Sequence, residues 1–434
     1  MRKDTNDQIQ DHPSSPAKPA NKEGNGLISV EAARKIILSE IHILGNEKVL
    51  LSESLGRTLF EEIRSPLNHP PWDTSAMDGY AVRTADTTNA APEKTARLKI
   101  IEEIPAGTLP QKTVGAGEAA KIMTGAPMPK GADAVVKVEE TTRREEIVEI
   151  HQVPEPGAFI RFKGEAVRKG EQVLNKGMRI RSAELAMMAS LGKSVVPVFQ
   201  RPRVAILSTG DELADLDEAR GESKILNSNG YGLAAQVTEA GGLPINLGIA
   251  RDDKDDLREK ISNGLSADFL LISGGVSMGD YDFVTEVLES LGVALRFWKV
   301  AMKPGKPIAF GVRNGRPIFG LPGNPVSSMV TFEQFVRPAM LAASGRLDIL
   351  RPTLMASLEA PLKKRPGRPQ FARARVSVRE GAYWVRSTGD QDSAILMSLV
   401  KANAFMILPP EGEMFKTGEK VPVQLLSEVA LPSD

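Results

Sequence analysis

A strand that runs into two glycines and then into a helix is the feature that most constrains how this chain can fold. The apolar run 269–272 is followed by Gly274 and Gly275, which offer no side chain to pack as a strand neighbour would. From 283 to 291, apolar residues recur at helical spacing. In an open parallel α/β sheet, ligands bind where strands give way to helices, so we expect a ligand at the turn 273–282. Backbone N–H groups in that turn suit an anion, and its carboxylates suit a metal.

Strands and helices alternate between 202 and 347. The run 204–207 is continuously apolar, which is typical of a strand buried on both faces. A helical pattern that begins at Asn229 follows it, and Asn314-Gly315 predicts a tight hairpin near the end of the region. This alternation predicts a doubly wound sheet with helices on both faces.

The rest of the chain does not show this alternation of strands and helices. Residues 1–26 are polar and lack the apolar stretch of a secretory signal, so we expect a disordered tail. The proline-rich stretch 66–71 predicts a domain boundary. Residues 72–157 carry short alternating segments between Gly and Pro turns, which predict a small β-rich domain. The segments after 350 are again short and β-like, and they predict a terminal β domain.

The composition excludes several classes of function. The 434 residues include 55 basic and 55 acidic side chains, so the whole chain offers no field for nucleic acid or a membrane surface. The absence of cysteine excludes disulfides and thiolate chemistry, and 4 histidines do not favour a histidine-rich zinc site. No apolar run reaches the ~18 residues of a membrane helix. We therefore expect a cytoplasmic protein whose anionic ligand is held by a local cluster.

Four polar loops are expected to meet at one edge of the predicted sheet, at 208–212, 273–282, 299–306 and 320–328. Together they supply hydroxyls, lysines, carboxylates and bare amides, which suit an oxyanion beside a divalent cation. Each loop alone also fits an ordinary turn or helix cap, whereas one anionic ligand accounts for all four. Neither the phosphate-binding Gly-x-x-x-x-Gly-Lys-Ser/Thr motif nor a complete Gly-x-Gly-x-x-Gly motif after a strand occurs.

Six motifs in order resemble the molybdopterin molybdenumtransferase family, which includes bacterial MoeA and the E domain of gephyrin. They read MDGYA at 77–81, IMTGA at 122–126, STGDEL at 208–213, SGGVSMGD at 273–280, KPGKP at 303–307 and LPGNPVS at 321–327. The resemblance extends from about residue 27 to 425. One departure stands in the 158–201 region, where the family usually has Gly-Glu-Asp and this chain reads Gly164-Glu165-Ala166.

The resemblance implies a multidomain α/β plus β protein. Its parts are the tail 1–26, a discontinuous elongated domain (27–70 and 158–201) and a β-rich inserted domain (71–157), followed by a MoaB/Mog-like doubly wound α/β domain (202–347) and a C-terminal β-barrel domain (348–434). It also implies a homodimer whose active site joins the α/β domain of one subunit to the inserted domain of the other. Transient contacts with other cofactor-biosynthesis proteins are expected as well.

The activity that the resemblance implies is insertion of molybdate into molybdopterin-AMP, with release of AMP and with Mg²⁺, or Zn²⁺ in its place, as the cation. The acids assigned to the metal are Glu212, Asp252 and Asp282. The residues assigned to catalysis are these three with Asp78, Lys299 and Lys303. The residues assigned to the pterin and molybdate are Thr124, Ser273, Gly274, Gly275, Ser277, Lys303, Lys306, Pro322, Ser327, Arg373 and Ser393.

Two other functions remain open from the sequence. A non-catalytic scaffold of the gephyrin kind uses the same fold, but the polar set just named would serve no purpose in it. A molybdopterin adenylyltransferase shares the α/β domain, but it would lack the flanking domains and the motif at 77–81. We therefore expect the molybdenum-inserting enzyme.

Overall fold

The structure is a computed structural model that describes residues 27–218, 222–275 and 283–429. The chain forms two compact units. The insert unit comprises 49–55 and 61–196, and the α/β-barrel unit comprises the segment up to 48, 56–60, and the chain from 197 onward. Within the described ranges, no helix is both long and apolar enough to cross a bilayer. The finer four-domain boundaries stay a prediction.

The α/β-barrel unit is built on a six-stranded sheet of order β16-β13-β17-β20-β19-β18. The first four strands in this order run parallel, and β19 lies antiparallel to both β20 and β18. Their bounds are β13 (Arg203–Thr209), β16 (Leu243–Ala250), β17 (Phe269–Ser273), β18 (Ala294–Trp298), β19 (Ala309–Arg313) and β20 (Arg316–Leu321). Asn314 and Gly315, at φ 51° and 74°, form the predicted hairpin between β19 and β20.

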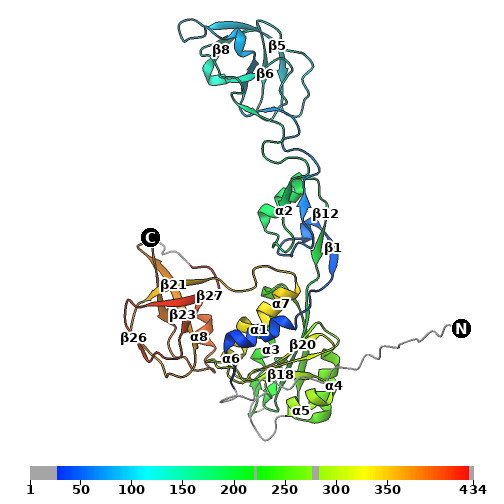
Figure 1. Ribbon diagram of the computed structural model, residues 1–434, viewed down its shortest axis with the longest axis vertical. Coiled ribbons are helices and arrows are strands. Elements are labelled where there is room, and N and C mark those ends of the chain that lie inside the picture. The colour runs from blue at the N-terminus through cyan, green and yellow to red at the C-terminus, as the bar shows by residue number, and fades with distance from the viewer. Residues whose placement is uncertain (1–26, 219–221, 276–282, 430–434) are drawn as a thin grey trace, which may run out of the picture. The chain divides into compact units, whose positions relative to one another are not determined.

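Helices cover both faces of this sheet (Figure 1). One face packs against α1 (Val30–Ser39), α3 (Ser228–Glu239), α6 (Pro325–Thr331) and α7 (Arg337–Ala343), with a π-helical turn, Phe332–Val336, between the last two. The other face packs against α4 (Lys254–Gly264) and α5 (Phe283–Ser290). β17 is buried along its whole length because both of its faces are covered. The doubly wound arrangement predicted from the sequence is confirmed.

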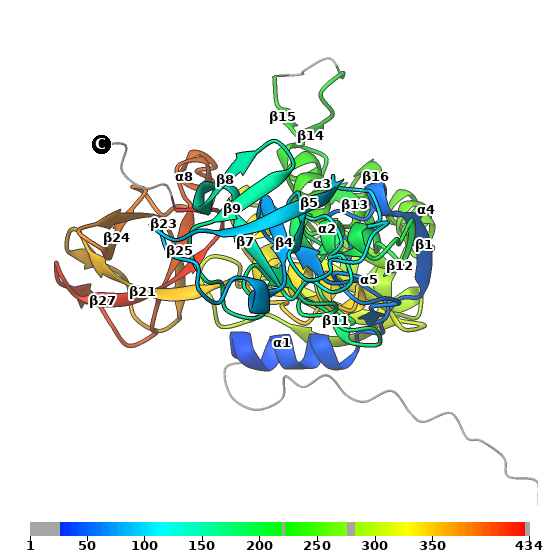
Figure 2. The same cartoon turned by 90° about the horizontal axis from the view of Figure 1, so that it is seen from above.

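The C-terminal part of the same unit is a closed barrel of order β21-β24-β23-β25-β27. Its bounds are β21 (Thr353–Leu358), β23 (Gln370–Arg379), β24 (Ala382–Ser387), β25 (Ala404–Leu408) and β27 (Lys420–Leu425), with the short pair β22 (Leu362–Lys363) and β26 (Met414–Phe415) and helix α8 (Met397–Val400). A small parallel pair, β14 (Leu213–Ala214) and β15 (Ile225–Leu226), extends away from the main sheet (Figure 2). The predicted C-terminal barrel is therefore confirmed.

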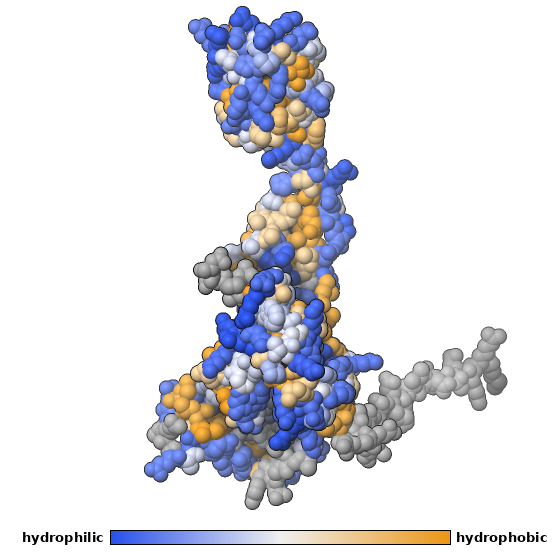
Figure 3. Space-filling model, turned by 90° about the vertical axis from the view of Figure 1, so that its left-hand side faces the viewer, coloured by the Kyte–Doolittle hydropathy of each residue, from blue (hydrophilic) through white to orange (hydrophobic). Residues whose placement is uncertain are grey.

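The insert unit contains a second six-stranded sheet, of order β7-β4-β6-β5-β9-β8. Its bounds are β4 (Gly79–Val82), β5 (Ala96–Ile104), β6 (Glu118–Ile122), β7 (Ala134–Lys137), β8 (Thr141–Arg144) and β9 (Ile147–Ile150). Alternate residues of β4 enter two apolar clusters, with Tyr80 and Val82 in one and Ala81 in the other. Because apolar residues pack inward, the visible surface of this sheet region is mainly hydrophilic (Figure 3).

Short elements flank that sheet in the chain. They are β2 (Ile63–Arg64), β3 (Thr74–Ser75), β10 (Ile160–Arg161), β11 (Gln172–Leu174) and α2 (Ser182–Ser190), with the 3₁₀ turns Leu51–Glu53, Thr84–Asp86 and Val138–Glu140. β1 (Asn46–Leu50) and β12 (Val195–Phe199) lie where the chain passes between the two units. The fold class expected from the sequence is thus present: an α/β domain, a β-rich insert and a barrel.

Candidate functional site

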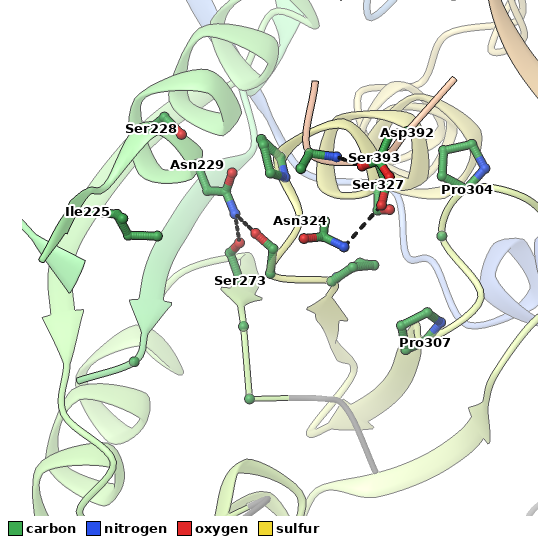
Figure 4. A pocket seen from close by; sticks show the side chains of 18 of the residues that line it. Ile225, Ser228, Asn229, Ser273, Pro304, Pro307, Asn324, Ser327, Asp392 and Ser393 are labelled. Carbon is green, nitrogen blue, oxygen red and sulfur yellow. Dashed lines mark hydrogen bonds between the residues drawn. The ribbon is translucent and has the colours of Figure 1, made fainter. Parts of the chain in front are cut away.

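A cavity of about 1140 Å³ lies at the carboxyl ends of the parallel strands in the α/β-barrel unit (Figure 4). All four loops predicted to converge contribute to it, and a loop of the barrel at 390–394 joins them. The predicted site residues that line it are Glu212, Asp252, Ser273, Gly274, Gly275, Lys303, Lys306, Pro322, Ser327 and Ser393. Most of the predicted site residues in this unit therefore line one cavity.

Glycines form one wall of the cavity. Gly274 and Gly275 have φ values of 99° and 64°, in the region that favours glycine. A Cβ on Gly274 would lie 2.6 Å from the carbonyl oxygen of Thr209, and one on Gly323 would lie 3.7 Å from the Cα of Gly274. The loops that follow β13, β17 and β20 therefore approach one another backbone to backbone. A ligand at this wall meets main-chain atoms with no side chain in the way.

Carboxylates line another part of the cavity. Glu212 folds over Gly210, whose φ is 145°, so closely that a Cβ on Gly210 would collide with the carboxylate. The backbone N–H of Asp252 donates to Asp211 Oδ1 at 3.3 Å, which links the loops after β13 and β16. Glu212 and Asp252 thus come from neighbouring strands and line one cavity.

These two acids fit a magnesium ion shared with a substrate. Mg²⁺ is usually bound by one or two carboxylates together with phosphate oxygens and water. Within the described ranges, no group of three or more His, Cys, Asp or Glu side chains could hold a metal by itself. The cavity lining contains no histidine, and zinc prefers nitrogen and sulfur ligands. The third predicted metal acid, Asp282, lies outside the described residues.

Cations line the cavity where the barrel meets the sheet. Lys303 and Lys306 lie in the loop between β18 and β19, and Arg368 precedes β23. The Lys303 backbone pairs with the barrel, because its N–H donates to Pro369 O at 3.0 Å and its carbonyl accepts from the N–H of Phe371 at 2.8 Å. The lysine loop is therefore held by the sheet strands that it connects and by the barrel. Arg368 is a cavity residue that the sequence alone did not single out.

The barrel loop 390–394 is attached to the start of α6. The N–H of Val326 donates to Ser393 O at 3.1 Å, and Asn324 Nδ2 donates to Ser393 Oγ at 3.0 Å. Asn324 and Pro325 are the N-cap and first residue of the helix. Ser327 and Ser393 therefore face the same cavity (Figure 4).

Arg373 supports this loop from behind. It is fully buried and does not line the cavity. Its Nε donates to Ser398 Oγ at 3.0 Å and its Nη2 donates to Asp392 O at 2.9 Å, while its Nη1 has no partner among the residues that the structure describes. Burial lowers the pKa of the guanidinium, and the charges of Asp390 and Asp392 oppose that shift. Arg373 thus positions the loop rather than facing the cavity.

Three further predicted site residues lie away from the cavity lining, and Ser277 belongs to a segment that the structure does not describe. The backbone N–H and hydroxyl of Thr124 donate to Asp78 Oδ1 at 2.7 and 2.8 Å, and both residues belong to the insert unit. These bonds lower the pKa of the Asp78 carboxyl, so it is ionised at neutral pH. Lys299 Nζ lies 4.5 Å from the ring centre of Trp298, and Lys299 does not line the cavity. Ser277, like Asp282, lies outside the described residues.

Several cavity residues were missed from the sequence. Asn227, Asn229 and Asn324 all line the cavity, and none of them is among the predicted site residues. The predicted helix start at Asn229 is wrong by one residue, since α3 begins at Ser228. Asn227 is the cap because its Oδ1 accepts from the N–H of Gly230 at 3.0 Å. This leaves the Asn229 side chain available for contacts within the cavity.

Comparison with known proteins agrees with this architecture. Residues 28–192 match the MoeA N-terminal region (domain I and II), residues 205–342 match a probable molybdopterin binding domain, and residues 355–426 match the MoeA C-terminal region (domain IV). The fold and site are thus those of a protein of the molybdopterin-binding class with MoeA-type flanking regions.

Individual relatives identify the family. The chain is 39% identical to a molybdopterin molybdenumtransferase from Nostoc sp., over 84% of this chain and 85% of the relative, and 37% identical to one from Bacillus subtilis, over 88% and 90%. A crystal structure of the molybdopterin biosynthesis MoeA protein from Pyrococcus horikoshii OT3 superposes with a TM-score of 0.80 at 33% identity, covering 92% of this chain and 100% of that one. This chain belongs to the molybdopterin molybdenumtransferase family, and the family assignment made from six motifs is confirmed.

Proposed function

We propose that this chain inserts molybdenum into adenylylated molybdopterin and releases AMP, which yields the molybdenum cofactor. The observation that carries the proposal is the single cavity in which carboxylates, lysines, an arginine and bare backbone converge. Molybdate is a tetrahedral dianion, and an adenylylated pterin carries phosphate oxygens. Both need positive charge and hydrogen-bond donors, and the leaving phosphate needs stabilisation as its charge develops.

The cavity residues divide the work by their chemistry. Lys303 and Lys306 hold molybdate with the hydroxyls of Ser327 and Ser393, because ammonium and hydroxyl groups both donate to oxyanion oxygens. The phosphate-bearing tail of the pterin lies along the wall formed by Ser273, Gly274 and Gly275, with Pro322 beside it. In this arrangement the dithiolene sulfurs and the molybdate meet between the two groups of residues.

Glu212 and Asp252 would hold Mg²⁺ in this proposal, and the sequence offers Asp282, outside the described residues, as a third acid. When bound, the cation neutralises charge that develops on the phosphate as AMP leaves. Glu212 and Asp252 keep their carboxylates at the cavity wall, where their negative charge disfavours binding of the phosphate directly against them. Lys303, which also lines the cavity, stabilises the anionic oxygens of the substrate.

Molybdate-dependent AMP release tests the function directly. The purified full chain is incubated with adenylylated molybdopterin, Mg²⁺ and molybdate, and nucleotide products are separated by chromatography. We expect AMP to appear only when molybdate is present. AMP formation at the same rate without molybdate, or no AMP formation in any sample, would reject the proposal. Running the assay with ATP and free molybdopterin distinguishes an adenylyltransferase, which would consume ATP.

The active protein is proposed to be a cytoplasmic homodimer in which Asp78 and Thr124 of one subunit complete the cavity of the other. The support for this proposal is the state and location of the Asp78 carboxylate. Asp78 is an exposed, ionised carboxylate fixed by Thr124, and it lies in the insert unit rather than in the unit that contains the cavity. Transient contact with the proteins that make the substrate and receive the product accompanies this role.

Complementation between two inactive variants tests the shared site. Asp78→Asn and Glu212→Gln chains are each expected to be inactive. Dimers that contain one of each restore one intact site, so co-expression should recover about a quarter of wild-type activity on statistical grounds. Light scattering checks the mass of each sample. No recovery from a mixed dimer, or a monomeric wild-type protein with full activity, would contradict a shared site.

A further inference from the structure

Asn229 connects two loops of the cavity wall. It is the second residue of α3, is partly buried and lines the cavity. Its Nδ2 donates to Ser273 Oγ at 2.9 Å, at the end of β17, and to Gly323 O at 2.7 Å, in the loop after β20 (Figure 4). One amide group therefore ties together the two loops that approach each other backbone to backbone.

The chemistry of these bonds fixes their direction. Gly323 O is a carbonyl and can only accept, so the Asn229 atom that faces it must be the nitrogen. That nitrogen also faces Ser273, and its two hydrogens are used by these two contacts. The Ser273 hydroxyl is therefore an acceptor toward Asn229, and its own proton is directed elsewhere.

The hydroxyl of Ser273 borders the cavity. Ser273 is only 1% exposed but lines the cavity. Across the described segments, no residue accepts a hydrogen bond from this hydroxyl. A buried hydroxyl without an acceptor is unfavourable, and a ligand oxygen in the cavity would supply one. Ser273 is thus prepared to donate to an acceptor such as a phosphate oxygen.

We propose that Asn229 is a positioning residue that sets the hydrogen-bond direction of Ser273, so that the serine donates to a phosphate oxygen of the substrate. The inference rests on the proposed function for the identity of that substrate. Asn229 acts through Ser273, and its bond to the Gly323 carbonyl holds the amide group in place for that contact. Its contribution to binding therefore depends on whether Ser273 carries its hydroxyl.

A double-mutant cycle tests this dependence. The dissociation constant of adenylylated molybdopterin is measured by calorimetry without molybdate or Mg²⁺, for wild type, Asn229→Ala, Ser273→Ala and the double variant. A hydrogen bond to a charged group corresponds to a loss of about tenfold or more, so each single variant should bind at least about tenfold more weakly. Because one residue acts through the other, the double variant should lose little more than either single variant, well short of about 100-fold.

Steady-state kinetics and a control variant separate positioning from a general loss of structure. Asn229→Ala should raise KM with little change in kcat, because the contact is made before and during the reaction. Thr238→Ala, at an exposed position of the same helix, should leave both unchanged. Losses that multiply in the double variant, or wild-type affinity for Asn229→Ala, would overturn the proposal.

The same cycle is run with AMP, whose phosphate presents similar oxygens. If the wild-type chain binds AMP but not adenylylated molybdopterin, the proposed function fails while the AMP cycle still decides the role of Asn229. If it binds neither, both proposals are rejected.

Discussion

Replacing Glu212 by glutamine is expected to lower molybdate-dependent AMP release by at least about 100-fold, a loss typical of removing a group that stabilises developing charge. The substitution keeps the size of the side chain and removes its charge. Glu212 lines the cavity and is folded over Gly210, where the absence of a Cβ leaves space for the carboxylate. Its loss removes one of the two described acids proposed to hold Mg²⁺. Initial rates measured over a range of Mg²⁺ concentrations should show a higher requirement for the cation.

Glu218→Gln provides the matched control. Glu218 lies shortly after β14, is exposed and does not line the cavity. Its carboxylate accepts from the backbone N–H of Asp215 at 3.3 Å and forms a long ion pair with Arg251 at 3.9 Å. We expect it to keep activity within about twofold, because exposed ion pairs contribute little. Equal losses in the two variants would show that charge on this segment matters in general, and unchanged activity in Glu212→Gln would remove that residue from the site.

The main architecture could be predicted because its signals are local. The apolar run before Gly274 and Gly275 can only be a buried strand that ends in a turn, and the structure places β17 there. Asn314-Gly315 has the backbone preference of one hairpin type, so the β19–β20 turn followed from two residues. The convergence of the four loops followed from the rule that parallel strands end at one edge of a sheet.

The roles that were missed depend on contacts between distant segments. Asn229 lies 44 residues from Ser273 and 94 from the glycine whose carbonyl it binds, and nothing near it in the sequence indicates either contact. Its neighbour Asn227 competes for the same role of helix cap, and which one caps is decided by the N–H of Gly230. Local patterns could locate the helix start only to within one residue.

Burial was the other property that motifs could not supply. Arg373 was assigned to the pterin and molybdate because of its resemblance to a family position, yet its guanidinium is buried behind the loop that carries Ser393. Lys299 comes from a loop that reaches the cavity, but its ammonium lies over the Trp298 ring. Whether a charged side chain faces a cavity or packs beside it depends on the barrel and sheet together, which no single segment encodes.

Replacing Gly274 by alanine is expected to be the most damaging small change in the α/β-barrel unit. Its φ of 99° is a conformation that side chains other than glycine rarely adopt, which costs about 1–3 kcal/mol. The new Cβ would also lie 2.6 Å from a backbone oxygen, that of Thr209, so one of the two loops must move, at a further cost of about 1–3 kcal/mol. A displacement of about 1 Å in a substrate-binding wall can lower the rate by about 100-fold. Thermal unfolding and AMP-release assays should therefore show a lower melting temperature and at least that loss of kcat/KM.

Gly292→Ala separates crowding from backbone strain. Gly292 follows α5, has a φ of 78°, and a Cβ there would meet no atom within 4 Å. This variant should be destabilised by about 1–2 kcal/mol, the cost of a left-handed residue with a side chain, and should keep its activity. Gly274→Ala should exceed it in both measurements, since only Gly274 lies against another loop of the cavity. If the two variants unfold at the same temperature and are equally active, the close approach of the backbones at Gly274 and Thr209 does not shape the site. The proposal that the glycine wall holds the substrate would then be rejected.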